Sequence, residues 1–232
     1  MNDLTILAII PARGGSKGIQ RKNIKKLNGK PLIAYSIETA LQCDRINRIA
    51  VTTEDDEIYN YANTYDINVI KRPKELAKDD SPTLPVLQHT IDYLKTSSHF
   101  QPDIIVLLQP TSPLRTVEDI DNCIDKLIFE RCDTVVSIKK ISHPIEWIVT
   151  KDEHDKIKHF IPRKKNLRRQ DSNIQIFLPN GAVYVFWLAT IMERKMIYGP
   201  DTRAYVMPDK RSIDIDSEFD FFIAEKILEK MK

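Results

Sequence analysis

A glycine-rich, basic segment near the N-terminus carries the side chains with the clearest chemical potential. Residues 11–23 have the sequence PARGGSKGIQRKN, in which Arg13, Lys17, Arg21 and Lys22 supply positive charge. The glycines let backbone N–H groups approach a ligand closely, and successive N–H groups form a concavity suited to anions. An arginine grips phosphate oxygens bidentately, whereas a lysine acts as a point charge. The segment therefore predicts a loop that binds a triphosphate.

Two common phosphate-binding signatures do not describe this loop. A Walker loop requires GxxxxGK followed by Ser or Thr, and the segment has no such string. A dinucleotide fingerprint requires GxGxxG, whereas Gly14, Gly15 and Gly18 are spaced differently. Judged on the loop alone, a flexible basic surface segment remains the alternative interpretation.

A second polar segment follows the apolar run at residues 103–108. Gln109, Thr111 and Ser112 offer directional hydrogen bonds suited to hydroxyl or amide groups, and Arg115 suits a carboxylate. Ligands of parallel α/β sheets bind outside the carboxyl ends of the strands, which is where this segment would lie. The alternative is a proline-stiffened turn that begins a helix.

A pair of carboxylates near the C-terminus is the third candidate. Asp214 and Asp216 alternate in the sequence RSIDID, and alternate residues of a strand face the same side. Two carboxylates beside phosphates are a usual way to hold Mg²⁺. The alternative is that Asp216 caps the following helix while Asp214 is solvated.

Apolar strands alternating with amphipathic helices must position these segments. Alternation of this kind implies parallel pairing with right-handed crossovers, hence an α/β fold. We expect strands at Leu4–Ile10, Arg48–Thr53, Ile67–Ile70, Asp103–Leu108, Thr134–Ile138, Ala182–Trp187 and Tyr205–Met207, and helices at Pro31–Leu41, Asp55–Tyr65, Thr83–Leu94, Thr116–Phe129 and Glu218–Lys230.

The alternation breaks between residues 140 and 180. This stretch is richer in Pro, Lys, Arg and Asn, with short possible strands at Trp147–Thr150 and Lys158–Ile161. Long irregular segments of this kind are usually functional or carry an interface. We therefore interpret residues 140–180 as an excursion from a single domain.

Composition limits the class of protein and partner. Lys and Arg total 35 and Asp and Glu total 33, so the net charge of +2 argues against a nucleic-acid binder. Positive charge is nevertheless concentrated at residues 13–30 and 156–169, which contain no acid. The three cysteines show no metal-ligand spacing, and we find no secretory signal or membrane span in the sequence. We expect a cytoplasmic protein without a membrane partner.

Taken together, these segments resemble the acylneuraminate cytidylyltransferases, or CMP-sialic acid synthetases, and relatives that activate legionaminic or pseudaminic acid. The resemblance covers nearly the whole chain and rests on ordered motifs at residues 10–23, 30–35, 108–115, 168–171, 180–184 and 214–216. It implies a Rossmann-like, mainly parallel α/β domain of the nucleotide-diphospho-sugar transferase type over residues 1–232, without the extra C-terminal domain of some animal members. It also implies a homodimer in which residues 140–180 reach across the partner and close its site.

The resemblance also implies roles for individual residues. It implies CTP contacts at Arg13, Ser16, Lys22 and Asn23, with Lys17 and Arg21 in the same loop and a further contact at Arg72. It implies a sugar-acid pocket at Thr83, Gln109, Arg169 and Tyr184. Asp214 and Asp216 match residues that hold Mg²⁺, and Arg13, Lys22 and Asp216 are the expected catalytic residues.

The implied reaction transfers CMP from CTP to the anomeric hydroxyl of a nine-carbon keto sugar acid, releases pyrophosphate, and serves cell-surface polysaccharide biosynthesis. Departures from the family pattern at Gln20 and Phe177 touch the acceptor side, so the identity of the acid stays open. One alternative is another sugar nucleotidyltransferase, such as a Kdo cytidylyltransferase, for which we expect a different first loop. A non-catalytic nucleotide-binding protein is the other alternative, and it could lack the aspartate pair.

Overall fold

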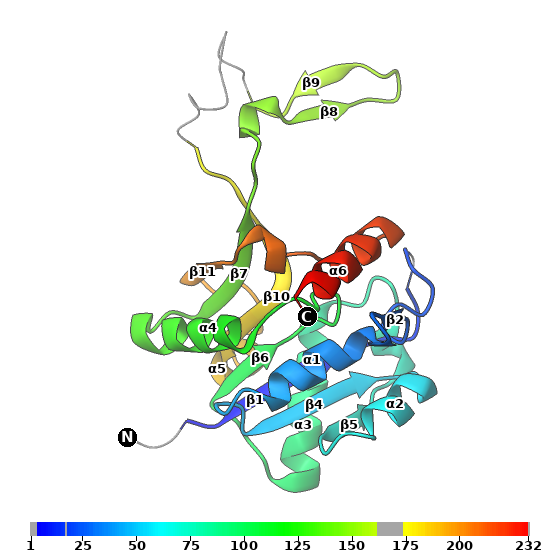
Figure 1. Ribbon diagram of the computed structural model, residues 1–232. Coiled ribbons are helices and arrows are strands. Elements are labelled where there is room, and N and C mark those ends of the chain that lie inside the picture. Colours follow the sequence, from blue (N-terminus) through cyan, green and yellow to red (C-terminus); the bar gives the residue numbers. More distant parts are fainter. Residues whose placement is uncertain (1–3, 17, 162–173, 232) are drawn as a thin grey trace.

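A seven-stranded sheet forms the centre of the structure, a computed structural model that describes residues 4–16, 18–161 and 174–231 (Figure 1). Its order is β11-β7-β10-β6-β1-β4-β5. The strands are β1 Ile6–Pro11, β4 Arg48–Thr53, β5 Asn68–Lys71, β6 Ile104–Leu107, β7 Thr134–Lys140, β10 Phe177–Trp187 and β11 Thr202–Val206. Only β10 runs against its neighbours β6 and β7 within the described sheet, so the prediction of a mainly parallel α/β fold is confirmed.

Helices cover both faces of this sheet (Figure 1). They are α1 Leu32–Leu41, α2 Asp56–Ala62, α3 Thr83–Ser98, α4 Val117–Glu130, α5 Leu188–Met192 and α6 Glu218–Lys230. One apolar cluster includes Ile37, Ile58 and Ile124, from α1, α2 and α4. The other face packs against α3 and α5 through Leu87 and Ile191. Because both faces are covered, the central strands β1 and β6 are continuous apolar runs.

Helix α6 covers a third apolar cluster beside the predicted phosphate loop. Ile19 of the loop and Ile215 of the C-terminal segment are buried there against Phe221 of α6. Short pieces complete the chain: β2 Lys26–Leu27, β3 Lys30–Pro31, η1 Lys74–Ala77, η2 Ile145–Trp147, β8 Val149–Lys151, β9 Ile157–His159 and η4 Asp209–Arg211. The third cluster thus fixes the loop against the segment that carries the aspartate pair.

The local patterns predicted most of these elements, although helix α5 was not expected. The helix start at Thr116 has the capping box with Asp119. Strand β10 begins at Phe177, earlier than expected, because its register with β7 shifts between Pro179 and Tyr184. The expectation that the aspartate pair lies on a strand is wrong, since residues 212–216 follow η4 without regular secondary structure.

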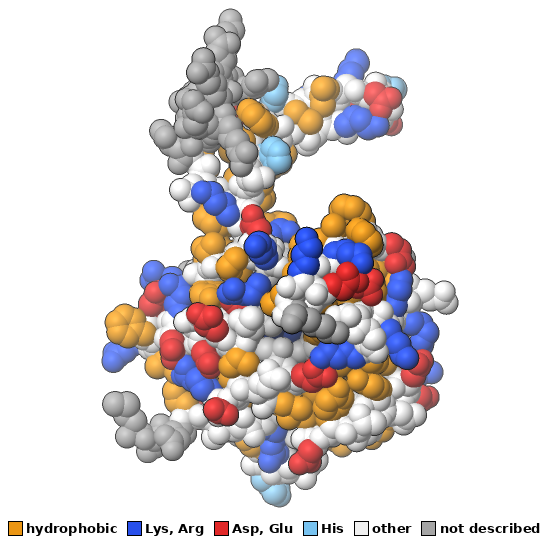
Figure 2. All heavy atoms as spheres, viewed as in Figure 1, with side chains coloured by type: hydrophobic (Ala, Val, Ile, Leu, Met, Phe, Trp, Pro, Cys, Tyr) orange, Lys and Arg blue, Asp and Glu red, His pale blue; other side chains and the backbone are white. Residues whose placement is uncertain are grey.

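Strands β8 and β9 form a hairpin that projects beyond the sheet (Figure 1). It lies between β7 and β10, within the excursion predicted at residues 140–180. Figure 2 shows hydrophobic side chains on this projection, and Trp147, Ile157 and Phe160 are exposed. Among the helices of the described residues, none is long and apolar enough to span a membrane.

Candidate functional site

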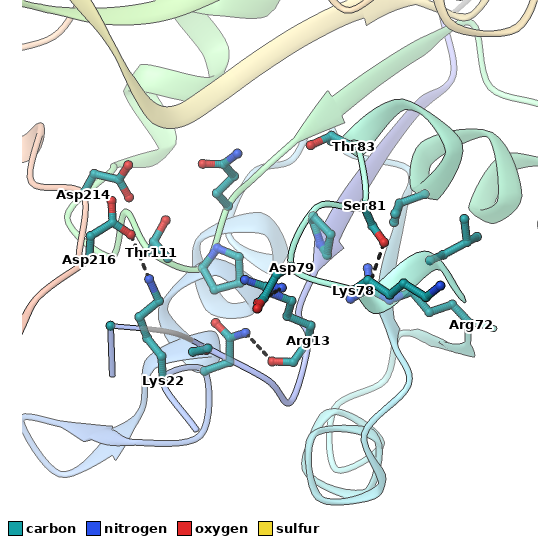
Figure 3. Close-up of a pocket in the computed structure, with 18 residues that line it drawn as sticks. Arg13, Lys22, Arg72, Lys78, Asp79, Ser81, Thr83, Thr111, Asp214 and Asp216 are labelled. Carbon is teal, nitrogen blue, oxygen red and sulfur yellow. Dashed lines mark hydrogen bonds and ion pairs between the residues drawn. The ribbon is translucent and has the colours of Figure 1, made fainter. Parts of the chain in front are cut away.

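A cavity of about 390 Å³ opens at the carboxyl ends of β1 and β6 (Figure 3). It brings together most of the residues singled out from the sequence. These are Arg13, Ser16, Lys22, Asn23, Arg72, Thr83, Gln109, Asp214 and Asp216. Segments far apart in the chain therefore meet at one edge of the sheet, as the topology of parallel α/β sheets requires.

The loop after β1 forms one wall of the cavity. The Asn23 side-chain amide donates to the Arg13 carbonyl at 2.9 Å, which closes the loop across its base. The buried Asn23 Oδ1 has no hydrogen-bond partner in the described part of the chain. A Cβ on Gly18 would lie 2.0 Å from the Asp216 carbonyl oxygen, so a glycine is required where the loop meets the C-terminal segment. The guanidinium of Arg13 points at Asp79, with Nη1 2.6 Å from Oδ1.

The aspartate pair faces this loop (Figure 3). Lys22 Nζ donates to Asp216 Oδ1 at 3.0 Å and to the Ile215 carbonyl at 2.6 Å. Asp216 is exposed, whereas Asp214 is partly buried and its Oδ1 has no partner among the described residues. Burial raises the pKa of Asp214, although a hydrogen bond with Thr111 acts in the opposite direction. A positive group beside Asp214 would stabilise its ionised carboxylate.

Gly181 makes room for the polar groups at the back of the cavity. Its φ of +72° lies in the region that favours glycine. A Cβ there would lie 2.5 Å from Gln109 Oε1 and 3.4 Å from Asp214 Oδ2. A side chain on any other residue at position 181 would therefore clash with Gln109.

Arg72 lies on the opposite wall, directly after β5. Its side chain is only 4% exposed, and Nη2 donates to Glu54 Oε2 at 3.2 Å. Burial lowers the pKa of Arg72, and the nearby Glu54 carboxylate opposes that effect. Thr83, the first residue of α3, also borders the cavity.

Two predicted site residues do not line this cavity, and two others are not among the residues that the structure describes. Arg21 turns away and binds Asp55 at 3.0 and 2.9 Å, so the loop directs it to the start of α2. Tyr184 is buried on β10 and packs against Phe186 with ring centroids 6.3 Å apart. Lys17 lies outside the described residues, and so does Arg169 with the rest of the 168–171 motif.

Arg115 corrects a further expectation. It is 3% exposed and donates to the Ala182 carbonyl at 2.7 Å, to Ser36 Oγ at 2.6 Å and to the Gln109 carbonyl. Burial lowers its pKa to about 9. Its guanidinium is therefore used to fix the segment that carries Gln109, and is not available to a substrate carboxylate.

Sequence reasoning missed several lining residues. Lys78, Asp79 and Ser81 border the cavity from the segment before α3. Thr111, singled out from the sequence for its hydroxyl group, also lines the cavity. The signal was the polar composition of residues 78–82, placed between a strand and a helix at the edge where ligands bind. Spacing alone did not connect that segment with the first loop.

The chain matches the Cytidylyltransferase family model over residues 7–176. It is 34% identical to CMP-N,N'-diacetyllegionaminic acid synthase of Legionella pneumophila, over 97% of each protein. It is 31% identical to pseudaminic acid cytidylyltransferase of Campylobacter jejuni, over 97% of this chain and 96% of that one. N-acylneuraminate cytidylyltransferase of Escherichia coli is 34% identical over 97% of this chain, which spans about half (52%) of that relative.

Two solved structures share the fold. CMP:2-keto-3-deoxy-manno-octonic acid synthetase complexed with CTP superposes with a TM-score of 0.70 at 14% identity, covering 98% of this chain and 100% of that one. 4-Diphosphocytidyl-2C-methyl-D-erythritol synthase from Anaerococcus prevotii has a TM-score of 0.64 at 13% identity, with the same coverage. At these identities the likeness concerns the arrangement of the sheet and helices.

Proposed function

Because the chain belongs to the cytidylyltransferase family, we propose that it transfers CMP from CTP to the anomeric hydroxyl of a nine-carbon keto sugar acid and releases pyrophosphate. The names of the relatives, which concern acylneuraminate, pseudaminic acid and diacetyllegionaminic acid, support this class of acceptor. The observation that carries the proposal is a single cavity in which the basic loop faces the aspartate pair. A site with these two halves suits a transfer between a triphosphate and a sugar acid.

The nucleotide occupies the half of the cavity lined by the first loop. Arg13, Ser16 and Lys22 bind the triphosphate together with the backbone N–H of Gly18, which also lines the cavity. Asn23 and Arg72 contact the nucleotide farther along the wall, and the unpartnered Asn23 Oδ1 is an acceptor available in the described structure. Arg13 exchanges its pairing with Asp79 for phosphate oxygens when CTP binds.

The acceptor occupies the other half. Gln109 orients the acid by hydrogen bonds, and Thr83 borders the same space. The anomeric hydroxyl oxygen attacks the α-phosphorus of CTP and releases its proton. The bond between that phosphorus and the oxygen bridging to the β-phosphate breaks, and pyrophosphate leaves with that oxygen. The protein accelerates this step by holding both reactants in line and by stabilising the developing charge with Lys22. Arg169 and Tyr184 remain predicted contacts of the acid.

The aspartate pair fits a divalent cation. Asp214 Oδ1 is a buried carboxylate oxygen without a described partner, and carboxylates are preferred ligands of Mg²⁺. No group of three or more acidic, histidine or cysteine side chains suited to a metal occurs within residues 4–16, 18–161 and 174–231. Asp214 and Asp216 would therefore hold Mg²⁺ together with substrate oxygens, and the ion would neutralise phosphate charge when bound.

The projecting hairpin supports a homodimer. Trp147, Ile157 and Phe160 expose apolar surface on an element that leaves its own domain, as expected of a segment that packs on another subunit. A cytoplasmic location is consistent with the cysteines, because Cys43, Cys123 and Cys132 are all buried free thiols.

The experiment that tests the acceptor class compares acids of different length. The purified protein is incubated with CTP, Mg²⁺ and N-acetylneuraminate, diacetyllegionaminate, pseudaminate or the eight-carbon acid Kdo, and pyrophosphate is measured. We expect release with at least one nine-carbon acid and little with Kdo. Faster release with Kdo than with every nine-carbon acid would overturn the proposed acceptor.

A further inference from the structure

Glu54 lies behind the cavity and connects its two walls. It follows β4 directly, and its carboxylate contacts both the first loop and the residue after β5. Oε1 accepts the backbone N–H of Gly14 in the first loop at 2.8 Å, and Oε2 accepts Nη2 of Arg72 at 3.2 Å. Only 16% of the Glu54 side chain is exposed, so solvent screens these contacts weakly.

The charge of Glu54 matters most for Arg72. The Arg72 side chain is 4% exposed, and its Nε has no hydrogen-bond partner in the described residues. A buried cation that loses its counter-charge is strongly disfavoured and must move or expose itself to water. Glu54 thus balances the charge of the guanidinium and holds it in place on the cavity wall.

The adjacent acid reinforces the same junction from the loop side. Asp55 binds the guanidinium of Arg21 through both carboxylate oxygens and also caps α2. A Cβ on Gly14 would lie 2.4 Å from Asp55 Oδ2, so the loop packs directly on this acidic corner. The start of α2 is therefore a fixed support for the loop, and Glu54 extends that support to Arg72.

We propose that Glu54 is a positioning residue for CTP: its carboxylate holds the phosphate loop and Arg72 at a fixed separation. The inference rests on the function proposed above for the same cavity. Glu54 acts through Gly14 and Arg72, since the described cavity lining includes Arg72 but not Glu54. Its loss weakens nucleotide binding while the acceptor half, with Gln109 and Asp214, keeps its geometry.

The test is the Glu54→Gln variant, which keeps the side-chain volume and an acceptor for the Gly14 N–H but removes the charge facing Arg72. The Kd of CTP is measured by calorimetry, and steady-state kinetics give the KM of each substrate. We expect CTP to bind about 10- to 100-fold more weakly, as for one lost hydrogen bond to a charged group. The KM of the sugar acid is expected to stay within about twofold, because no contact in that half changes.

Asp56→Asn is the matched control. This neighbouring carboxylate is 90% exposed and pairs with Lys71, so its removal is expected to leave CTP binding unchanged. Equal CTP affinity in Glu54→Gln and wild type would overturn the proposal, as would equal losses in both variants. A wild-type protein that binds no CTP would instead overturn the proposed function.

If Glu54→Gln does not fold, Glu54→Asp provides the test. It keeps the charge but shortens the side chain, so it cannot contact Gly14 and Arg72 at the observed distances together. We expect weaker CTP binding with an unchanged KM for the acid. Wild-type CTP affinity in this variant would contradict a bridging role.

Discussion

The carboxylate of Asp214 is expected to destabilise the free protein while serving its activity. Burial raises the pKa of Asp214, and Oδ1 has no hydrogen-bond partner in the part of the chain that the structure describes. An ionised carboxylate that is buried without full compensation costs about 1–3 kcal/mol. The variant D214N removes the charge but keeps the shape. It should therefore be inactive and yet more stable than the wild type.

The size of the effect follows from partial burial. We expect D214N to gain about 1 kcal/mol in the free energy of unfolding, near the low end of that range because Asp214 is only partly buried. For a domain of this size the gain corresponds to a rise of about 2–4 °C in Tm. Differential scanning calorimetry without nucleotide measures it. In the same protein, kcat is expected to fall by at least about 100-fold, as for loss of a group that acts on developing charge.

The dependence on pH provides an internal check. A carboxyl whose pKa is raised in the folded state lowers stability when ionised, so the difference between D214N and wild type is full above the folded pKa of Asp214. It disappears below the ordinary aspartate pKa of about 3.9, where both states are protonated. D216N is the control, since the Asp216 side chain is 78% exposed and its pair with Lys22 contributes at most about 1 kcal/mol. If D214N is less stable than wild type at pH 7, the Asp214 carboxylate does not destabilise the folded protein.

Three further predictions concern a buried ion pair outside the cavity and two positions at the site. D119N is expected to lose about 3 kcal/mol in urea unfolding at pH 7, because Arg211 donates to the buried carboxylate at 3.0 and 2.7 Å. Burial opposes ionisation of Asp119, but hydrogen bonds from Arg211 outweigh it and lower the pKa of this carboxyl. The stability difference between wild type and D119N should therefore shrink as the pH falls through that pKa. A difference that stays the same at every pH would contradict this prediction. K22A should raise the KM of CTP about tenfold or more with stability changed by less than about 1 kcal/mol, and an unchanged KM would exclude a phosphate contact. G181A should lower the free energy of unfolding by about 1–2 kcal/mol, because alanine disfavours the positive φ at this position. Its Cβ would also collide with Gln109, so the KM of the acid should rise more than that of CTP. Steady-state kinetics with each substrate varied in turn measure both KM values.

Local patterns were sufficient to predict most of the fold. The apolar run of β1 and the capping box at Thr116 each depend on a few consecutive residues, and the structure has both. The direction of β10 depends on pairing with β6 and β7, which lie far away in the sequence. Hydrophobic periodicity carries no information on that pairing, so the antiparallel strand was not predicted.

The candidate site shows the same division. The composition of the first loop predicted a basic wall, and Arg13 and Lys22 line the cavity. Arg21 has the same chemistry, but its partner Asp55 is 34 residues away and directs it elsewhere. The guanidinium of Arg115 likewise donates its hydrogen bonds to Ala182 and other internal acceptors, which come near it only in the folded chain. Residue type predicted chemistry, whereas long-range contacts decided which cations face the ligand.

In the proposed reaction, the basic loop and the aspartate pair act together in transferring CMP to a sugar acid. The most direct measurement follows CTP and a nine-carbon acid by ³¹P NMR with Mg²⁺, for wild type and for D216A with a matched circular-dichroism spectrum. We expect a CMP-sugar resonance and pyrophosphate in equal amounts from wild type, no product when ATP replaces CTP, and none from D216A. Wild-type protein that leaves CTP intact with every acid, or D216A with normal turnover, would contradict it.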